Sequence, residues 1–332
     1  MNEQQHWPWP AGSATGVGSM PGDDIAEAQR VVFGELPDLP HLAELPDRGA
    51  GADIIGRTCA FLVELPVELY VGAWRIAARP GRDLRRAADF LDRDLDQLAE
   101  QGDGYTGVVK VQAAGPYTLA ANVDLPVGGR LLRDQGAVRD LITSLTEGLR
   151  THVDDVRRRL PGATVLLQVD EPALPTVLAG HVPTESGFSA YRAVETNTAA
   201  DALRALVTGV GAPVTFHCCA ADVPISLFVS AGASALSLDL SLVTSLDPLG
   251  EAIDAGVGLL AGVAATSGAR APGSKELVDR VRGVWNQLGF GADLLRRQVV
   301  VTPTCGLAGA SATYAKDVLA ACRDAGRRLA EE

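Results

Sequence analysis

A regular alternation of short apolar runs and longer amphipathic stretches constrains the fold of this chain more than any other feature. From residue 107 onward, runs rich in Val, Ile, Leu and Ala recur, and each is followed by a stretch with apolar residues at helical spacing. Continuous apolar runs are typical of strands that are buried on both faces of a parallel sheet. The alternation therefore predicts an α/β protein in which helices connect parallel strands.

The N-terminal third repeats the pattern less regularly. Residues 14–22 and 41–49 are short apolar segments closed by turn residues, and they predict a first and a second strand, whereas residues 53–80 leave the assignment open. The whole chain then contains about eight strands, each followed by helical material, which is the (β/α)8 pattern. We expect one TIM barrel over residues 13–332 after an irregular arm over residues 1–12. An open doubly wound sheet is the rival, but it rarely needs this many repeats.

Composition and charge narrow the class of protein. The chain has 332 residues, of which 47% are hydrophobic, and this suits a single large barrel with a full core. A net charge of −12 argues against a nucleic-acid or anionic-membrane partner, and no apolar run is long enough to span a bilayer. Five cysteines in a chain of this length, without a signal-peptide pattern at its start, favour a reducing compartment. We expect a cytoplasmic protein that acts on a small molecule.

Polar side chains stand where the predicted strands end. The chemistry of such barrels takes place at the carboxyl ends of the strands, so we expect these side chains to converge on one mouth. Each also has a structural explanation, because Ser and Asp cap helices and a Glu can be a solvated loop charge. The candidates are Ser19, Glu44, Asp170, His217, Cys219, Asp239 and Cys305.

Four of these candidates predict a metal site. Side chains alternate along a strand, so His217 and Cys219 point to one face while Cys218 points to the other and packs in the core. Cys305 ends the eighth predicted strand and Asp239 ends the sixth. One imidazole, two thiolates and one carboxylate suit zinc better than magnesium or calcium.

Five motifs, in this order, resemble the catalytic barrel of the cobalamin-independent methionine synthase family. That barrel belongs to a fold type shared with uroporphyrinogen decarboxylase. The motifs spread over most of the chain, and the Asp-Glu-Pro-Ala-Leu and Cys-Gly-Leu motifs around His-x-Cys are specific in combination. They are Gly18-Ser19-Met20-Pro21, Gly115-Pro116-Tyr117-Thr118, Gln168-Val169-Asp170-Glu171-Pro172-Ala173-Leu174, His217-Cys218-Cys219 and Pro303-Thr304-Cys305-Gly306-Leu307.

The resemblance implies an activity and a division of roles. It implies zinc held by His217, Cys219, Asp239 and Cys305, with the thiol of homocysteine bound to the metal and methylated to methionine. The position of Ser19 implies binding of the substrate carboxylate. The resemblance implies that Glu44 and Asp170 are catalytic and substrate-binding residues that bind the substrate ammonium. They end the second and fourth predicted strands, so we expect them across the mouth from the zinc ligands. Two carboxylates are suitable acceptors for one ammonium.

The chain departs from the family pattern in three places. The ligand that is Glu in the family is Asp239 here, one methylene shorter, so the metal has either this fourth ligand or three protein ligands and a water. The N-terminal half of the double-barrel members has no counterpart. The family's Asp-x-His after strand seven, whose His protonates the folate leaving group, matches a stretch at residues 262–268 that contains no His. Because an amine leaving group needs a general acid, a methyl-corrinoid donor competes with methyl-folate.

Two other functions stay open on the sequence. The first is a uroporphyrinogen-decarboxylase-like barrel enzyme, which needs no zinc and whose mouth arginines would be Arg48, Arg57 and Arg75. The second is a non-catalytic zinc-binding regulatory protein. Metal content separates the first from a methyltransferase, and methyl transfer from methylcobalamin separates the second.

Overall fold

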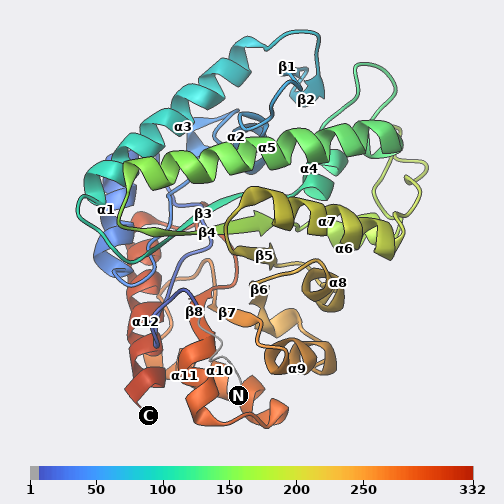
Figure 1. Ribbon diagram of the computed structural model, residues 1–332. Coiled ribbons are helices and arrows are strands. Elements are labelled where there is room, and N and C mark those ends of the chain that lie inside the picture. The colour runs from blue at the N-terminus through green and yellow to red at the C-terminus, as the bar shows by residue number, and fades with distance from the viewer. Residues whose placement is uncertain (1–6, 332) are drawn as a thin grey trace.

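Six parallel strands form the main sheet of the protein. The computed structural model describes residues 7–331. Its strands lie side by side in chain order and curl around a common axis (Figure 1), which is the order expected when every connection is a right-handed crossover. They are β3 (Val108–Ala114), β4 (Thr164–Asp170), β5 (Val214–Cys218), β6 (Ala235–Asp239), β7 (Gly258–Ala264) and β8 (Val299–Pro303).

Two short segments close the ring between β8 and β3. Ala14 bridges Val301 of β8, Ser19 bridges Glu44, and His41 bridges Lys110 of β3, all in parallel. The amide of Thr15 donates to the carbonyl of Val301 at 3.1 Å, and that of Leu42 donates to Lys110 at 2.9 Å. These segments occupy the first and second barrel positions as isolated bridges. The predicted α/β class and TIM-like barrel are confirmed.

The outer layer consists of helices that follow the strands (Figure 1). It contains α1 (Ile25–Glu35), α2 (Ile54–Cys59), α3 (Arg82–Gln101), α4 (Pro116–Asn122), α5 (Gln135–Arg159), α6 (Leu174–Leu178), α7 (Thr196–Val210), α8 (Ile225–Ser230), α9 (Asp247–Asp254), α10 (Ser274–Leu288), α11 (Ala292–Gln298) and α12 (Ala312–Glu331). Three short 3-10 turns are η1 (Pro46–Arg48), η2 (Leu131–Arg133) and η3 (Leu240–Leu242).

Two segments differ in detail from what the sequence pattern predicts. The open stretch at residues 53–80 contains α2 and an antiparallel hairpin of β1 (Val67–Tyr70) and β2 (Ala73–Ile76). The second segment is the stretch after Ser274, where α10 ends at Leu288 and a separate helix, α11, begins at Ala292. Gly289 then adopts φ 78°, a left-handed conformation that glycine adopts without steric cost at a helix end.

Apolar side chains close the end of the barrel at which the strands begin, opposite their carboxyl ends. Trp9, only 5% exposed, packs with residues from five strands: Val108, Leu166, Ala235, Leu260 and Val300. A Cβ on Gly258 would lie 2.5 Å from the Trp9 ring, so this position needs a glycine. The described part of the predicted arm therefore packs against the barrel floor. A polar functional site is therefore expected at the opposite end, where the carboxyl ends of the strands lie. Within residues 7–331, no helix is both long and apolar enough to cross a membrane.

Candidate metal centre

His217 offers a free nitrogen at the end of β5. Its Nδ1 lies 3.0 Å from the hydroxyl of Ser237 and 3.1 Å from the Ser237 carbonyl, and Ser237 is its register partner on β6. Its Nε2 is buried and has no hydrogen-bond partner in the described part of the chain. Fixing one ring nitrogen in this way orients the other as a ligand, which is the usual outer-shell arrangement of metal-binding histidines.

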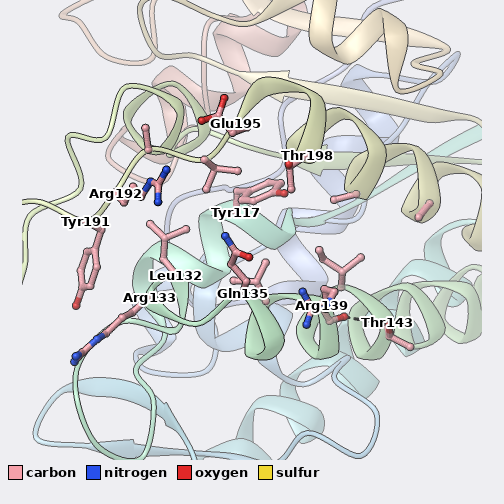
Figure 2. Close-up of a pocket in the computed structure, with 16 residues that line it drawn as sticks. Tyr117, Leu132, Arg133, Gln135, Arg139, Thr143, Tyr191, Arg192, Glu195 and Thr198 are labelled. Atoms are coloured by element: carbon pink, nitrogen blue, oxygen red, sulfur yellow. Dashed lines mark hydrogen bonds between the residues drawn. The ribbon is translucent and has the colours of Figure 1, made fainter.

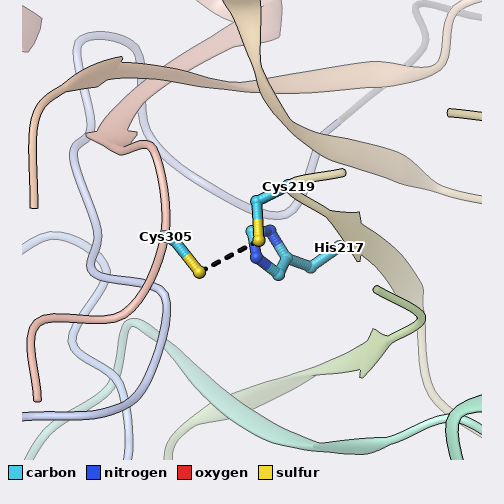
Figure 3. A group of neighbouring side chains, drawn as sticks. All are labelled: His217, Cys219 and Cys305. Atoms are coloured by element: carbon cyan, nitrogen blue, oxygen red, sulfur yellow. Dashed lines mark hydrogen bonds between the residues drawn. The ribbon is translucent and has the colours of Figure 1, made fainter. Parts of the chain in front are cut away.

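Two thiols meet this imidazole. The Sγ atoms of Cys219 and Cys305 lie 3.0 Å apart, and both cysteines are free thiols. One ligand atom from each of His217, Cys219 and Cys305 falls within 4.8 Å of the others (Figure 3). Cys218 points away and is buried in the core, as strand alternation predicts, and burial raises the pKa of its thiol to about 12.

Glycines allow the Cys305 turn to reach the other two ligands. A Cβ on Gly262 of β7 would lie 2.4 Å from the carbonyl of Leu238 and 3.0 Å from Thr304, which precedes Cys305. A Cβ on Gly306 would lie 2.0 Å from the hydroxyl of Ser19. Side chains at these two positions would displace the turn. The glycine of the Cys-Gly-Leu motif, Gly306, is therefore required because a side chain there would collide with Ser19.

The pKa values of the two thiols shift in opposite directions. The pKa of Cys305 is lowered, because Cys219 donates a hydrogen bond to its sulfur and His217 lies nearby, whereas the pKa of Cys219 is raised by the same hydrogen bond and by burial. A thiolate next to a neutral thiol and a free imidazole nitrogen is a soft N/S/S donor set. The group can hold a metal ion, and its donor chemistry fits zinc.

Asp239, the fourth ligand predicted from the sequence, does not join this group. Its Oδ1 accepts from the amide of Ser241 at 2.9 Å and from the Ser241 hydroxyl at 2.6 Å, which caps η3. The candidate metal group of the described residues consists of His217, Cys219 and Cys305 alone. Among the described residues, the structure therefore brings no fourth side chain into this group.

Asp170 ends β4 directly beside the metal ligands. It is in register with Ala114 on one side and with His217 on the other. The expectation that it lies across the mouth from the zinc ligands is wrong, because the register of β4 and β5 makes Asp170 and His217 neighbours. Its Oδ1 accepts from the Gln168 side-chain amide at 2.7 Å, and burial raises its pKa to about 7.

Ser19 and Glu44 are paired where the two closing segments complete the ring. They bridge one another in the two closing segments, and the Ser19 carbonyl accepts from Leu307, two residues after Cys305. Glu44 is 6% exposed, and burial raises its pKa, although the Arg57 guanidinium lies 3.4 Å away. Ser19 thus lies close to the segment that carries Cys305, whereas Glu44 and Asp170 end the second and fourth strands of the ring, with β3 between them.

Sequence reasoning missed two buried polar residues near this ring. Glu171 accepts from the amides of Tyr117 and Thr118 at 2.9 and 2.8 Å and from the Thr118 hydroxyl at 2.7 Å. Glu171 thereby connects the start of α4 to the end of β4. In the sequence, Gly115-Pro116 before a helix was the signal that an anionic group could bind at the start of that helix.

Lys110 is the second missed residue. Its Nζ donates to the carbonyl of Val17 at 2.8 Å inside the barrel, and burial lowers its pKa to about 7. The charges of Asp170 and Glu44 oppose that shift, so the lysine and the two acids form one buried charge cluster. The one charged residue in a buried, mostly apolar strand was its signal in the sequence.

The fold and the ligand group define a class of protein: a TIM-like barrel with a candidate His/Cys/Cys metal centre at its mouth. Residues 105–328 match the family described as the catalytic domain of cobalamin-independent synthases, and the chain belongs to that family. The family resemblance seen in the motifs is thereby confirmed. No curated protein matches the chain.

Two solved structures are similar to the whole chain. A B12-independent methionine synthase from Shewanella sp. W3-18-1, in complex with selenomethionine, has a TM-score of 0.64 at 10% identity, and the match covers 97% of this chain and 98% of that one. A methyltransferase from Methanosarcina mazei has a TM-score of 0.54 at 14% identity, covering 96% and 93%. At these identities the two likenesses show the fold. With the family match, the chain is a methyltransferase domain of the methionine synthase type.

Proposed function

We propose that this protein is a zinc-dependent thiol methyltransferase that methylates homocysteine to methionine. One observation carries the proposal: the buried, unpartnered Nε2 of His217 lies within reach of two free thiols at the mouth of a barrel of this family. The buried His41 and His152 also leave ring nitrogens without a partner, so it is the two thiols beside His217 that set this histidine apart.

The metal site supplies the nucleophile. Zinc bound by these three residues would lower the pKa of a thiol at its open position, which keeps the substrate sulfur ionised at neutral pH. His217 keeps its orientation through Ser237, and Asp239 is engaged with Ser241. The open position can therefore accept the substrate thiol.

The remaining mouth residues fit the amino-acid end of the substrate. Asp170 and Glu44 are buried acids, and burial raises the pKa of both carboxyl groups, that of Asp170 to about 7. A substrate ammonium beside them would favour their ionised forms, since an opposite charge stabilises a carboxylate. We assign the ammonium to these two residues and the substrate carboxylate to Ser19, whose hydroxyl is next to Gly306.

The methyl donor follows from the loop after β7. Residues 262–268 contain no histidine. The hydroxyl of Tyr314 reaches this loop, but it already donates a hydrogen bond to the carbonyl of Ala265 at 2.9 Å. A general acid contributes roughly a hundred- to ten-thousand-fold in rate when an amine leaves. We therefore propose a methyl-corrinoid, whose cobalt leaves without protonation, in preference to methyl-folate.

The arginines that would serve a decarboxylase have internal partners. Arg48 bonds Asp94 at 2.7 and 2.8 Å, Arg57 also pairs with Asp94, and Arg75 pairs with Glu68 on the β1–β2 hairpin. This disfavours a site for a polycarboxylated substrate, although it does not distinguish an enzyme from a zinc-binding regulator.

Turnover separates these functions. Zinc-loaded protein is supplied with homocysteine and, in parallel, with methylcobalamin or methyl-folate, and methionine is measured by mass spectrometry. We expect methionine from methylcobalamin at the higher rate. Methyl-folate rates that equal or exceed it would overturn the donor assignment, and no methionine from either donor would favour the regulator.

A further inference from the structure

A cavity of about 790 Å³ lies outside the barrel, between α5 and α7 and beside α4 (Figure 2). Its size is in the range of small-molecule sites. None of the proposed metal or substrate residues lines it. Most of its lining is apolar, including Leu132, Val138, Ile142 and Val194. A mostly apolar cavity of this size is a candidate for a ligand with a hydrophobic body.

The charges at its rim favour an anion. Arg133, Arg139 and Arg192 line the cavity with Glu195 as its one acid, although the whole chain has 41 acidic and only 29 basic residues. Arg133 is occupied, since it donates to the carbonyl of Gly128 at 2.8 Å. The guanidinium groups of Arg139 and Arg192 have no hydrogen-bond or ion-pair partner within the described residues.

Arginines elsewhere on the same helix behave differently. Further along α5, Arg150 pairs with Glu147, Arg158 with Asp155, and Arg159 with Asp96. Within the described residues, the two unpartnered guanidinium groups of Arg139 and Arg192 therefore lie beside one apolar cavity, where they can bind an anion.

The wall that carries Arg192 is fixed in place. Tyr191 is buried, its hydroxyl donates to Glu185, and it accepts from the amide of Arg130 at 2.9 Å. On the opposite side, the Tyr117 ring lines the cavity while its own amide is held by Glu171. Both walls are thus built from side chains with fixed hydrogen bonds, so the cavity exists before a ligand enters.

We propose that this cavity binds an organic anion with an apolar body, such as an aromatic carboxylate or sulfonate, whose charged group is held by an arginine of the lining, Arg139 or Arg192. The apolar lining contacts the body of the ligand. This inference is independent of the proposed methyl transfer, because the cavity shares no residue with the metal centre.

Two fluorescent probes that differ in one sulfonate group test the proposal. They are 8-anilinonaphthalene-1-sulfonate and its neutral analogue N-phenyl-1-naphthylamine, titrated against the zinc-loaded wild type and three variants. Arg139→Gln/Arg192→Gln removes the two charges, and Ala205→Trp blocks the apolar space. Arg158→Gln is the matched control on α5, and the wild type is the reference. Circular dichroism verifies that each variant is folded.

The expected result is saturable binding of one sulfonate probe per chain. The double arginine variant should weaken it about tenfold or more, as expected for the loss of charged hydrogen bonds, and leave the neutral probe unchanged. Ala205→Trp should weaken both probes, and Arg158→Gln neither. Absence of saturable binding, or equal loss of affinity in the double variant and in Arg158→Gln, would overturn the proposal.

Discussion

The two halves of the barrel mouth use polar side chains differently. In the ligand half, His217, Cys219 and Cys305 present an unpartnered nitrogen and two free thiols toward one point. In the acid half, made of Ser19, Glu44 and Asp170, the buried carboxyl groups already have polar neighbours in Arg57 and Gln168. We propose that the first half holds a soft metal cation and that the second binds a cationic group of the substrate. The boundary between them runs between the adjacent residues Asp170 and His217.

The largest expected effect comes from removing a ligand. Cys305→Ser replaces a thiolate with a hydroxyl that remains protonated at neutral pH, so the zinc content should fall from one per chain to near zero. Cys218→Ala is the matched control, because its thiol lies next to a ligand in the chain but faces the core. Elemental analysis of protein purified without chelator decides the result. An unchanged zinc content in Cys305→Ser would refute the assignment of Cys305 as a zinc ligand.

A smaller effect is expected from the acid half. Asp170→Asn removes the charge that we assign to the substrate ammonium, and homocysteine binding should weaken by about 1.5–3 kcal/mol, the usual scale for a charged hydrogen bond. The zinc content should stay at one per chain. Calorimetric titration and elemental analysis of the same sample test both statements. Because Asp170 neighbours His217, loss of zinc in this variant would show that the two halves are not separate.

The same substitution should change the pH dependence of stability in the metal-free protein. Burial raises the pKa of Asp170 to about 7, so the folded state keeps a proton that the unfolded state loses near pH 4. Stability from this group is complete below the unfolded pKa and is lost as the pH rises through the folded one. Melting temperatures of wild type and Asp170→Asn, measured with chelator from pH 4 to 8, should therefore diverge up to about pH 7, with the wild type losing stability. A constant difference would contradict this.

The smallest effect is expected at Asp239. Its carboxylate caps η3 through Ser241, and an asparagine can accept the same hydrogen bonds. Asp239→Asn should keep one zinc per chain with nearly unchanged affinity, measured by competition with a chromophoric chelator. Zinc loss comparable to that of Cys305→Ser would make Asp239 a fourth ligand and enlarge the ligand half.

Most of the fold was predictable because buried parallel strands must be continuous apolar runs. The exceptions are local. The break between α10 and α11 depends on Gly289, whose left-handed conformation ends a helix where the apolar spacing alone continues. The first two barrel strands are reduced to bridges, and a Cβ on Gly16 would lie 2.3 Å from the His41 ring. Such crowding depends on the closed ring and is invisible in a single segment.

The site was predictable where strand alternation decides the direction of a side chain. Alternation separates His217 and Cys219 from Cys218, and the structure follows it. It cannot decide between a ligand and a cap at Asp239, because that choice rests on Ser241 two residues further on. It also cannot place Asp170 relative to His217, since neighbours in the ring come from the pairing of strands far apart in the chain.

The central claim is that the ligand half holds zinc with one position left for the substrate sulfur. X-ray absorption at the zinc edge measures this directly, by counting sulfur neighbours before and after homocysteine is added. The account predicts one nitrogen and two sulfurs from the protein, with a third sulfur in the presence of homocysteine. An unchanged coordination shell at saturating homocysteine would contradict it.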